Sequence, residues 1–360
     1  MVPMEIDHPS ELPGPARSAH RPQLDGLRFL AFLAVFVHHA RPEVCPWGWA
    51  GVQFFFALSG FLITRILVRG ESGVLGADLR RYYYRRTIRI FPLYYALLLF
   101  VALTSRVDDL GWYLTYTYNI RLYQTQSWNH VVGHFWTLCV EEQFYLIYPL
   151  ALLLTAARLR LALVVGLIAL SKGFQWTANT QMSMPWARLL LPYCGEEILW
   201  GCLAGLADLR MGRARREGPA CFVAGFLVLV LAWACYEGRL PLPSPAGEVG
   251  SYSLYGIGSA LIVFGAWRSR SRWIVGPLAI GPVAYLGRIS YGLYAFHLPV
   301  IRGWYAEVPY GFLIPRPFGE LAMTVALAAA SWHCFEGPIN RRKDRTARKP
   351  GRGSSGEERG

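Results

Sequence analysis

An arginine and a histidine interrupt the apolar run between Leu24 and Ala40. Arg28 and His39 have ten residues between them, about three helical turns, so both side chains project from roughly one face of a helix. An ionisable group in a membrane segment costs a few kcal/mol or more, which makes it a functional candidate. Imidazole titrates near neutral pH and can take the proton of a hydroxyl group. His38 points about 100° away from His39, so we expect it to be a neighbour rather than a second base.

The composition places these residues in a membrane protein. Hydrophobic residues make up 54% of the 360 residues and charged residues only 16%, whereas globular domains carry about a quarter charged residues. The mean hydropathy is +0.28. Ten apolar stretches are candidate spans: residues 24–40, 47–63, 90–104, 144–157, 159–170, 189–206, 220–236, 252–267, 285–301 and 313–334. We therefore expect an all-α, polytopic membrane helix bundle with about ten transmembrane helices.

The basic residues fall in alternate loops, which sets the expected topology. The net charge is +13, and arginines gather before the first span, after the even-numbered spans and near the end of the chain. By the positive-inside rule, both termini lie in the cytoplasm and the protein is a multi-pass protein of the inner (plasma) membrane. The positive net charge is therefore explained by the loops that face the cytoplasm. The expected partner is the lipid bilayer rather than nucleic acid.

One domain accounts for most of the chain. Residues 1–20 form a polar cytoplasmic segment without the apolar core of a cleavable signal, residues 21–342 form the transmembrane domain, and residues 343–360 form a disordered basic cytoplasmic tail. The seven cysteines show no CxxC pair or zinc-ligand spacing, so we expect no metal site. No GxSxG motif surrounds a serine, which argues against a serine-hydrolase triad.

Five sequence blocks occur in order along this domain. They are LDGLRFLAFLAVFVHHA (24–40), GVQFFFALSGFLIT (51–64), YYRRTIRIFPLYY (83–95), HFWTLCVEEQFYLIYPL (134–150) and LGRISYGLYAFHLPV (286–300). Together they resemble the acyltransferase 3 family, integral-membrane enzymes that O-acylate sugars, polysaccharides, lipopolysaccharide and some secreted small molecules. A single block can occur by chance, but five blocks in the order of the family are a specific sign of resemblance. The resemblance covers about residues 21 to 342.

The resemblance implies an acyl-CoA-dependent O-acyltransferase. The donor is cytoplasmic acyl-CoA, with acetyl-CoA as the default, and the acceptor is a hydroxyl of a carbohydrate or a glycosylated small molecule. Acyl-CoA is then a co-substrate, and no bound cofactor is expected. The family signature of an arginine, ten residues and a histidine falls on Arg28 and His39. His39 is the catalytic candidate, either as general base or as a transient acyl carrier, and Arg28 is expected to steady the donor.

The RxxR element of the family falls on Arg86 and Arg89. Residues three apart share a helix face, so the two guanidinium groups can converge on one anion, such as the pyrophosphate of coenzyme A. We expect them at the cytoplasmic start of a span that begins near Ile90, where they bind the donor. The alternative is a positive-inside anchor, which explains the charge but not the spacing. Ser290 in the last block is expected to donate a hydrogen bond near the donor.

Other polar residues of the blocks are candidates for catalysis or support. Glu141 and Glu142 begin a span on the side of His39 and are catalytic candidates that could orient the imidazole, contact an acceptor sugar or brace an arginine; the alternative is that they only favour a helix N-terminus. The residues expected to contact the acceptor or support the site are Gln53, His134, Tyr291, His297 and Glu336.

Three of these expectations carry a qualification. Gln53 stands where the family often has an aspartate, so it can hydrogen-bond but cannot stabilise an imidazolium by charge. Glu336 has an equal alternative as the ion-pair partner of Arg341. The segment 115–130 is rich in aromatic and amide side chains and is expected to face the acceptor; the alternative is that its tyrosines only lie at the membrane interface.

Two other classes of function stay open at this point. A polytopic transporter or exporter of an acylated or glycosylated product also uses buried arginine and histidine, although the inverted repeats and paired broken helices of transporters are not seen. A catalytically impaired family member acting as a structural partner is permitted by Gln53 and disfavoured by His39 and Arg86.

Overall fold

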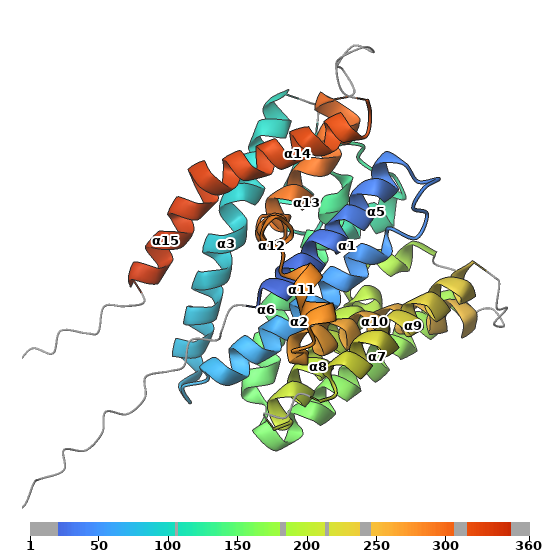
Figure 1. The fold of residues 1–360 in the computed structure, drawn as a ribbon, viewed down its shortest axis with the longest axis vertical. Coiled ribbons are helices and arrows are strands. Elements are labelled where there is room, and N and C mark those ends of the chain that lie inside the picture. The colour runs from blue at the N-terminus through green and yellow to red at the C-terminus, as the bar shows by residue number, and fades with distance from the viewer. Residues whose placement is uncertain are drawn as a thin grey trace, which may run out of the picture.

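The computed structural model describes residues 21–104, 107–180, 185–212, 216–237, 246–305 and 315–346. Within these ranges the chain is helical and contains no strand, which confirms the predicted all-α class (Figure 1). The α-helices are α1 (Pro22–Ala40), α2 (Ala50–Gly70), α3 (Leu75–Thr104), α4 (Leu110–Leu114), α5 (Tyr118–Thr125), α6 (Trp136–Leu154), α7 (Arg160–Thr180), α8 (Leu191–Arg210), α9 (Gly218–Tyr236), α10 (Ala246–Arg268), α11 (Arg272–Leu278), α12 (Gly281–Arg288), α13 (Ser290–Pro299), α14 (Phe318–Ser331) and α15 (Gly337–Thr346). The 3-10 turns are η1 (Gly133–Phe135), η2 (Ala157–Leu159) and η3 (Pro185–Leu189), and the π-helical turns are η4 (Val300–Trp304) and η5 (Trp332–Glu336).

Six of the described helical segments are long and apolar enough to cross a membrane. They are α2, α3, Gly133–Leu154, Ala157–Thr180, α9 and Val249–Arg268. Large apolar side chains on these helices are exposed, among them Leu103 on α3, Leu146 on α6 and Leu170 on α7. Large apolar side chains exposed on long apolar helices fit helices that face lipid.

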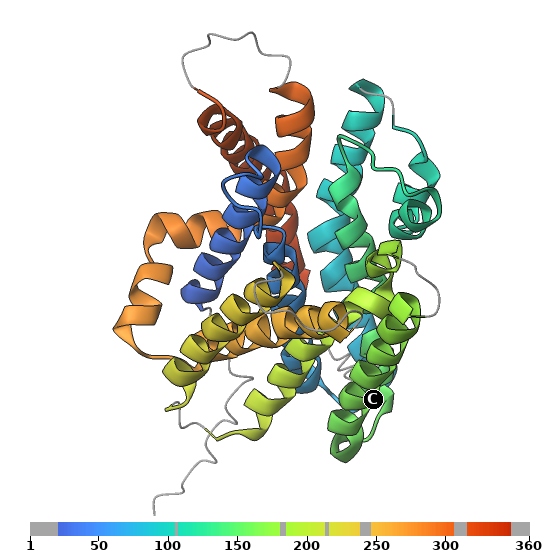
Figure 2. The ribbon, with the colours of Figure 1, turned by 90° about the vertical axis from the view of Figure 1, so that its right-hand side faces the viewer.

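The helices α1 and α2 connect the two sides of the molecule. α1 packs against α2 and α12, and α2 packs against α8 and α10. In Figure 1, α7 to α10 lie on one side of this pair, and α3, α14 and α15 lie on the other. Figure 2, turned by 90°, shows α3 and α6 together on the side opposite α11 and α12. Residues from both sides therefore converge on α1 and α2.

Two glycines allow α2 and α8 to approach closely. A Cβ atom at Gly60 would collide with the carbonyl of Ile198, and a Cβ atom at Gly201 would collide with the carbonyl of Ala57. Small residues bring membrane helices together because the burial of apolar surface gives little driving force in lipid. The two contacts fix the register of α2 against α8.

The structure corrects the start of the third predicted span. α3 begins at Leu75 and runs for 30 residues, whereas we expected the span to begin near Ile90 with the arginines at its start. No proline occurs between Leu75 and Pro92, so nothing ends the helix in the basic segment. Arg86 and Arg89 therefore lie within a long helix.

The tyrosines near the start of segment 115–130 are core residues rather than an acceptor-facing surface. Tyr116 stacks on Tyr94 of α3 with ring centroids 4.3 Å apart, and Tyr118 stacks on Tyr113 with centroids 4.0 Å apart. All four rings are buried. The rings of Tyr116 and Tyr118 are therefore taken up by packing against Tyr94 of α3 and Tyr113 of α4.

The ends of the chain differ in how far the structure describes them. α15 continues to Thr346, so the helix extends into the segment from residue 343 that we expected to be a disordered tail. The predicted polar segment 1–20 and residues 347–360 of the predicted tail lie outside the described residues.

Candidate active site

His39 lies in the last turn of α1. Its Nδ1 is 3.0 Å from the carbonyl oxygen of Val35, one turn earlier, and 3.3 Å from Nε2 of His297 on α13. A carbonyl oxygen only accepts hydrogen bonds, so we assign the proton of the neutral ring to Nδ1. Nε2 of His39 then carries a lone pair and can act as a base or a nucleophile.

Three histidines from distant parts of the sequence meet at this point. The ring centroids of His39 and His297 are 5.1 Å apart, and those of His134 and His297 are 4.8 Å apart. His134 and His297 are both buried, and Nε2 of His134 donates to the carbonyl of Ala295 at 3.2 Å. The part of the chain that the structure describes holds no group of three or more His, Cys, Asp or Glu side chains that could bind a metal. We call His39, His134 and His297 the histidine cluster.

His38 points away from this cluster, as the helical spacing predicts. Its Nδ1 donates to the carbonyl oxygen of Cys45 at 3.1 Å, in the turn between α1 and α2. Burial raises the pKa of the Cys45 thiol. Cys45 is thus a protonated packing residue, and the ring of His38 is anchored to the turn rather than to the histidine cluster.

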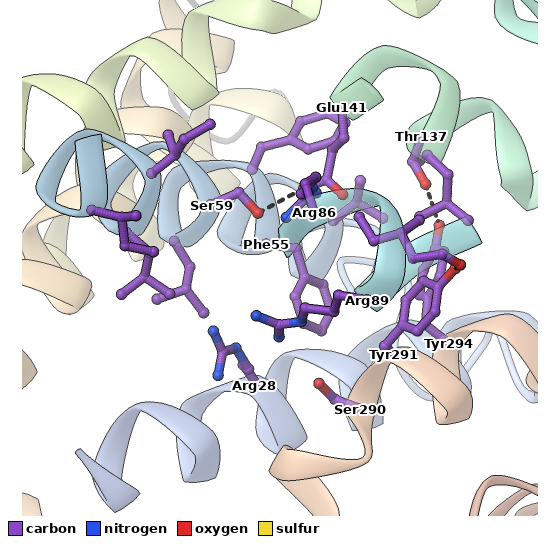
Figure 3. Close-up of a pocket in the computed structure, with 18 of the residues that line it drawn as sticks. Arg28, Phe55, Ser59, Arg86, Arg89, Thr137, Glu141, Ser290, Tyr291 and Tyr294 are labelled. Carbon is purple, nitrogen blue, oxygen red and sulfur yellow. Dashed lines mark hydrogen bonds between the residues drawn. The ribbon is translucent and has the colours of Figure 1, made fainter. Parts of the chain in front are cut away.

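A cavity of about 450 Å³ lies among α1, α2, α3, α6 and α13 (Figure 3). Arg28 and Arg89 point toward one another in the close-up, and both line the cavity. Apolar side chains cover much of the rest, including Phe55, Ile63 and Leu138. The combination suits a ligand with an anionic group and a long, weakly polar arm.

Arg86 is held by α6, and this changes the expected pairing of Arg86 with Arg89. Its Nε lies 3.3 Å from Oε1 of Glu142, and its guanidinium carbon lies 3.5 Å from the centroid of the Tyr145 ring. Arg28 faces Arg89 instead (Figure 3). Arg28 also pairs with Asp25, with Nη1 and Oδ1 2.8 Å apart. Arg28, Arg86 and Arg89 all line the cavity, so an anion there would meet Arg28 and Arg89, with Arg86 held beside them by Glu142.

The two glutamates of α6 have separate environments. Ser59 donates to Oε1 of Glu141 at 2.7 Å, and Tyr145 donates to the same oxygen at 3.0 Å. Glu141 lines the cavity, while Glu142 pairs with Arg86. Among the described contacts, those that orient the ring of His39 come from Val35 and His297 rather than from either glutamate.

The residues of α13 connect the cavity to the histidine cluster. Ser290, Tyr291 and Tyr294 line the cavity, and Tyr291 donates to the carbonyl of Ile90 at 2.9 Å. The ring of Tyr294 also packs against His134 and His297, with centroids 5.3 Å and 5.2 Å away. Ser290 and His297 thus lie on the same helix but serve two neighbouring regions, the cavity and the cluster.

Gln53 and Glu336 do not join the cluster through any described contact. Gln53 is buried, and its Oε1 has no hydrogen-bond partner among the described residues. Glu336 accepts a hydrogen bond from Ser331 at 2.9 Å, so its described partner is not Arg341. Neither side chain is among those that line the cavity.

Several cavity residues were missed by the sequence reasoning. They are Phe55, Ser59, Thr137 and Tyr294. Each lies inside one of the five blocks, together with residues that the sequence had marked as site candidates. Tyr294 was the easiest of them to find from the sequence. It lies three residues from both Tyr291 and His297 and therefore near their face of the helix.

A family model described as an acyltransferase domain, that of the acyltransferase 3 family, matches residues 21–334. The chain belongs to this family. All twelve candidate site residues except Glu336 fall within the matched range. The membership and the apolar helices together make the chain a multi-pass membrane protein.

Similar family members include peptidoglycan O-acetyltransferase OatA of Listeria monocytogenes, 25% identical over 89% of this chain and 56% of that protein. YrhL of Bacillus subtilis, provisionally named a peptidoglycan O-acetyltransferase, is 26% identical over 88% of this chain and 54% of that protein. A Staphylococcus aureus protein provisionally named an O-acetyltransferase is 22% identical, over 89% and 58% respectively. The chain spans little more than half the length of these relatives. No solved structure matches.

Proposed function

We propose that this family member is a membrane O-acetyltransferase that moves an acetyl group from acetyl-CoA to a hydroxyl group of a cell-envelope carbohydrate. One observation carries the proposal: a cavity with arginines on its wall and a buried histidine cluster share the ring of Tyr294. Donor binding and proton transfer are thereby brought to adjacent regions. The names of the relatives support acetyl as the group transferred and peptidoglycan as the acceptor to test first.

Arg28 and Arg89 bind the pyrophosphate of the donor in this proposal. Two guanidinium groups that face one another match the geometry of an anion between them, and each phosphate contact is charge-assisted. The pantetheine arm then lies along the apolar wall that includes Phe55 and Leu138. Ser290 is placed to donate to a polar atom of that arm.

His39 supplies the proton transfer. Its Nε2 takes the proton of the acceptor hydroxyl, the hydroxyl oxygen bonds to the acyl carbon, and the carbon–sulfur bond breaks. The proton then passes from the imidazolium to the departing thiolate, which leaves as free coenzyme A. In the covalent variant, Nε2 bonds to the acyl carbon as the carbon–sulfur bond breaks and coenzyme A departs as a thiolate. The acceptor oxygen then bonds to the acyl carbon, the Nε2–carbon bond breaks, and the hydroxyl proton passes to the thiolate through the freed imidazole. In either variant, Glu141 and Glu142 fix Ser59, Tyr145 and Arg86 around the cavity.

The topology that completes this proposal has both termini in the cytoplasm and about ten membrane passes in the inner membrane. The six long apolar segments supply part of that number. With this orientation the donor enters from the cytoplasm, and His39 lies toward the opposite side at the far end of α1 from Arg28. The distance between the two residues along the helix axis is about 16 Å, at about 1.5 Å per residue.

The first prediction concerns His39. In purified protein reconstituted in vesicles, His39→Ala is expected to lower acetyl transfer by at least about 100-fold, the effect of losing a general base. The assay uses radiolabelled acetyl-CoA and soluble peptidoglycan fragments and measures labelled ester. The matched control is His333→Ala, because His333 is exposed and hydrogen-bonds Tyr285 away from the cluster.

Full transfer by His39→Ala would remove His39 from the mechanism. Movement of separately labelled, pre-acetylated fragments across the vesicle membrane, with no ester formed from acetyl-CoA, would instead indicate the transporter alternative. Ester formation on other envelope carbohydrates, tested in parallel, would change the acceptor and leave the chemistry as proposed.

A further inference from the structure

His297 is a fully buried ionisable side chain whose role the proposed function leaves open. We propose that His297 is a positioning residue: its Nε2 accepts the Nδ1 proton of His39 and holds the reactive ring with Nε2 toward the acceptor. This inference rests on the proposed function of His39. It assigns to a neutral imidazole the task that a carboxylate performs for many catalytic histidines.

The hydrogen bonds fix which nitrogen of His297 accepts. Its Nδ1 lies 2.5 Å from the carbonyl oxygen of Tyr294, so Nδ1 carries the ring proton. In the neutral ring Nε2 then has only a lone pair. This lone pair faces Nδ1 of His39 at 3.3 Å, and Nδ1 of His39 carries a proton because it also faces the carbonyl of Val35. The tautomers of the two rings are complementary.

The same geometry stabilises His39 when it takes a proton. The proton from the acceptor hydroxyl adds to Nε2 of His39, and the positive charge strengthens the donor at Nδ1. Two acceptors then share that donor, the Val35 carbonyl and Nε2 of His297. His297 gains no proton in this step and remains neutral. The carboxylates near the cavity are engaged elsewhere, Glu141 with Ser59 and Glu142 with Arg86.

His297 is itself held in place. Phe32 of α1 meets its ring edge-on, with centroids 6.1 Å apart, and His134 packs against it from η1. The charged and titratable groups that face the pair from neighbouring elements are His38 on α1, His134 on η1 and Arg302 on η4. Each of these is neutral or cationic, so the compensating acceptor for His39 is the lone pair of His297.

Two substitutions of His297 test the hydrogen bonds of its two ring nitrogens separately. The side-chain amide of Asn reaches the position of Nδ1, and that of Gln reaches the position of Nε2. His297→Asn can keep the bond to Tyr294 but loses the acceptor for His39, whereas His297→Gln supplies that acceptor through Oε1. Both variants stay polar in a buried site, so a difference between them reports on the hydrogen bond to His39 rather than on packing.

The test combines kinetics with NMR on the reconstituted full chain. His297→Asn is expected to lower kcat about 10-fold to 100-fold, as for one hydrogen bond to a charged group, and to leave KM for acetyl-CoA within about twofold. The Nδ1–H proton signal of His39, assigned by its loss in His39→Asn, is expected to move upfield. His297→Gln restores most of kcat and the position of the signal. His38→Gln, which removes a neighbouring imidazole bonded to Cys45, leaves both unchanged.

Equal kcat losses in His297→Asn and His297→Gln with an unmoved Nδ1–H signal would overturn the positioning role and indicate packing alone. Wild-type kcat in His297→Asn would overturn it as well. In both cases an inactive His39→Ala would leave the proposed function intact. An active His39→Ala would remove His39 from the mechanism while acetyl transfer itself stands, and the NMR signal would then still report whether the hydrogen bond exists.

Discussion

Arg86 and Arg89 lie one turn apart on α3 but have different surroundings. Arg86 pairs with Glu142 and stacks on Tyr145, so it joins α3 to α6. Arg89 faces Arg28 in the cavity (Figure 3). The first arginine therefore builds the wall of the cavity, and the second is available to a ligand.

Separate substitutions test this division. Arg89→Gln is expected to raise KM for acetyl-CoA about 10-fold or more with kcat within about twofold, because it removes a charged contact to the donor. Arg86→Met leaves Glu142 without its partner and is expected to lower the free energy of unfolding by on the order of 2 kcal/mol. Steady-state kinetics and thermal unfolding in detergent measure the two effects. Equal KM increases at equal stability would contradict the division.

The sequence predicted the members of the histidine cluster but not their pairing. His39, His134 and His297 each lie in a family block, and their chemistry marked them as candidates. The hydrogen bond between His39 and His297 joins residues 258 positions apart, so packing among α1, η1 and α13 decides it. Helical spacing relates only residues within a few turns, so it cannot predict a contact between residues so far apart in the sequence. The same holds for Arg86, whose partner on α6 is 56 positions away.

At the level of elements, the contact between α2 and α8 depends on the absence of side chains. Gly60 and Gly201 each lie where a Cβ atom would meet a backbone carbonyl of the other helix. α2 also carries Phe55 and Ser59 on the cavity wall. A change in the separation of the two helices therefore moves part of the cavity.

Gly201→Ala is expected to destabilise the protein by about 1–3 kcal/mol, the usual cost of overpacking, because the backbones must separate. Gly166→Ala on α7 is the matched control, since a Cβ there meets nothing within 4 Å. In that helix position alanine is neutral or stabilising by up to about 1 kcal/mol. Thermal unfolding of the two variants in the same detergent gives the comparison. Similar melting temperatures for both would argue against the close contact.

Element boundaries were harder to predict than element type. The all-helical class follows from composition, and α1 lies close to the predicted apolar run 24–40, whereas α2 ends at Gly70, about two turns beyond the predicted run 47–63. α3 was predicted too short because its first half is basic, and a charged stretch resembles a loop when only hydropathy is considered. Tyr82 and Ile90 lie on the buried side of that half, and their burial sustains the helix.

For the molecule as a whole, the proposed topology places successive loops on opposite sides of the membrane. The turn between α1 and α2 contains Val44, which is 69% exposed, and the turn between α2 and α3 contains Val74, which is 62% exposed. Both are accessible positions in short connections. They form a matched pair for labelling.

In a variant that lacks the seven native cysteines, Val44→Cys is expected to react with a membrane-impermeant maleimide in intact spheroplasts. Val74→Cys is expected to react only after the membrane is made permeable, because the basic residues around it favour the cytoplasm. Mass spectrometry of the labelled protein measures both. The reverse pattern would invert the topology, and labelling of both in intact cells would contradict a membrane pass through α2.

The length of α3 has a consequence for the lipid. A helix of 30 residues is about 45 Å long, whereas the hydrocarbon core of a bilayer is about 30 Å thick. α3 must therefore cross obliquely or extend into the headgroups, and a helix with such a mismatch adjusts its inclination to the membrane around it. Arg86 and Arg89 lie near its middle, so the inclination of α3 sets the depth at which the two guanidinium groups sit. The acyl-chain length of the surrounding phospholipids therefore affects the depth of the two guanidinium groups in the membrane.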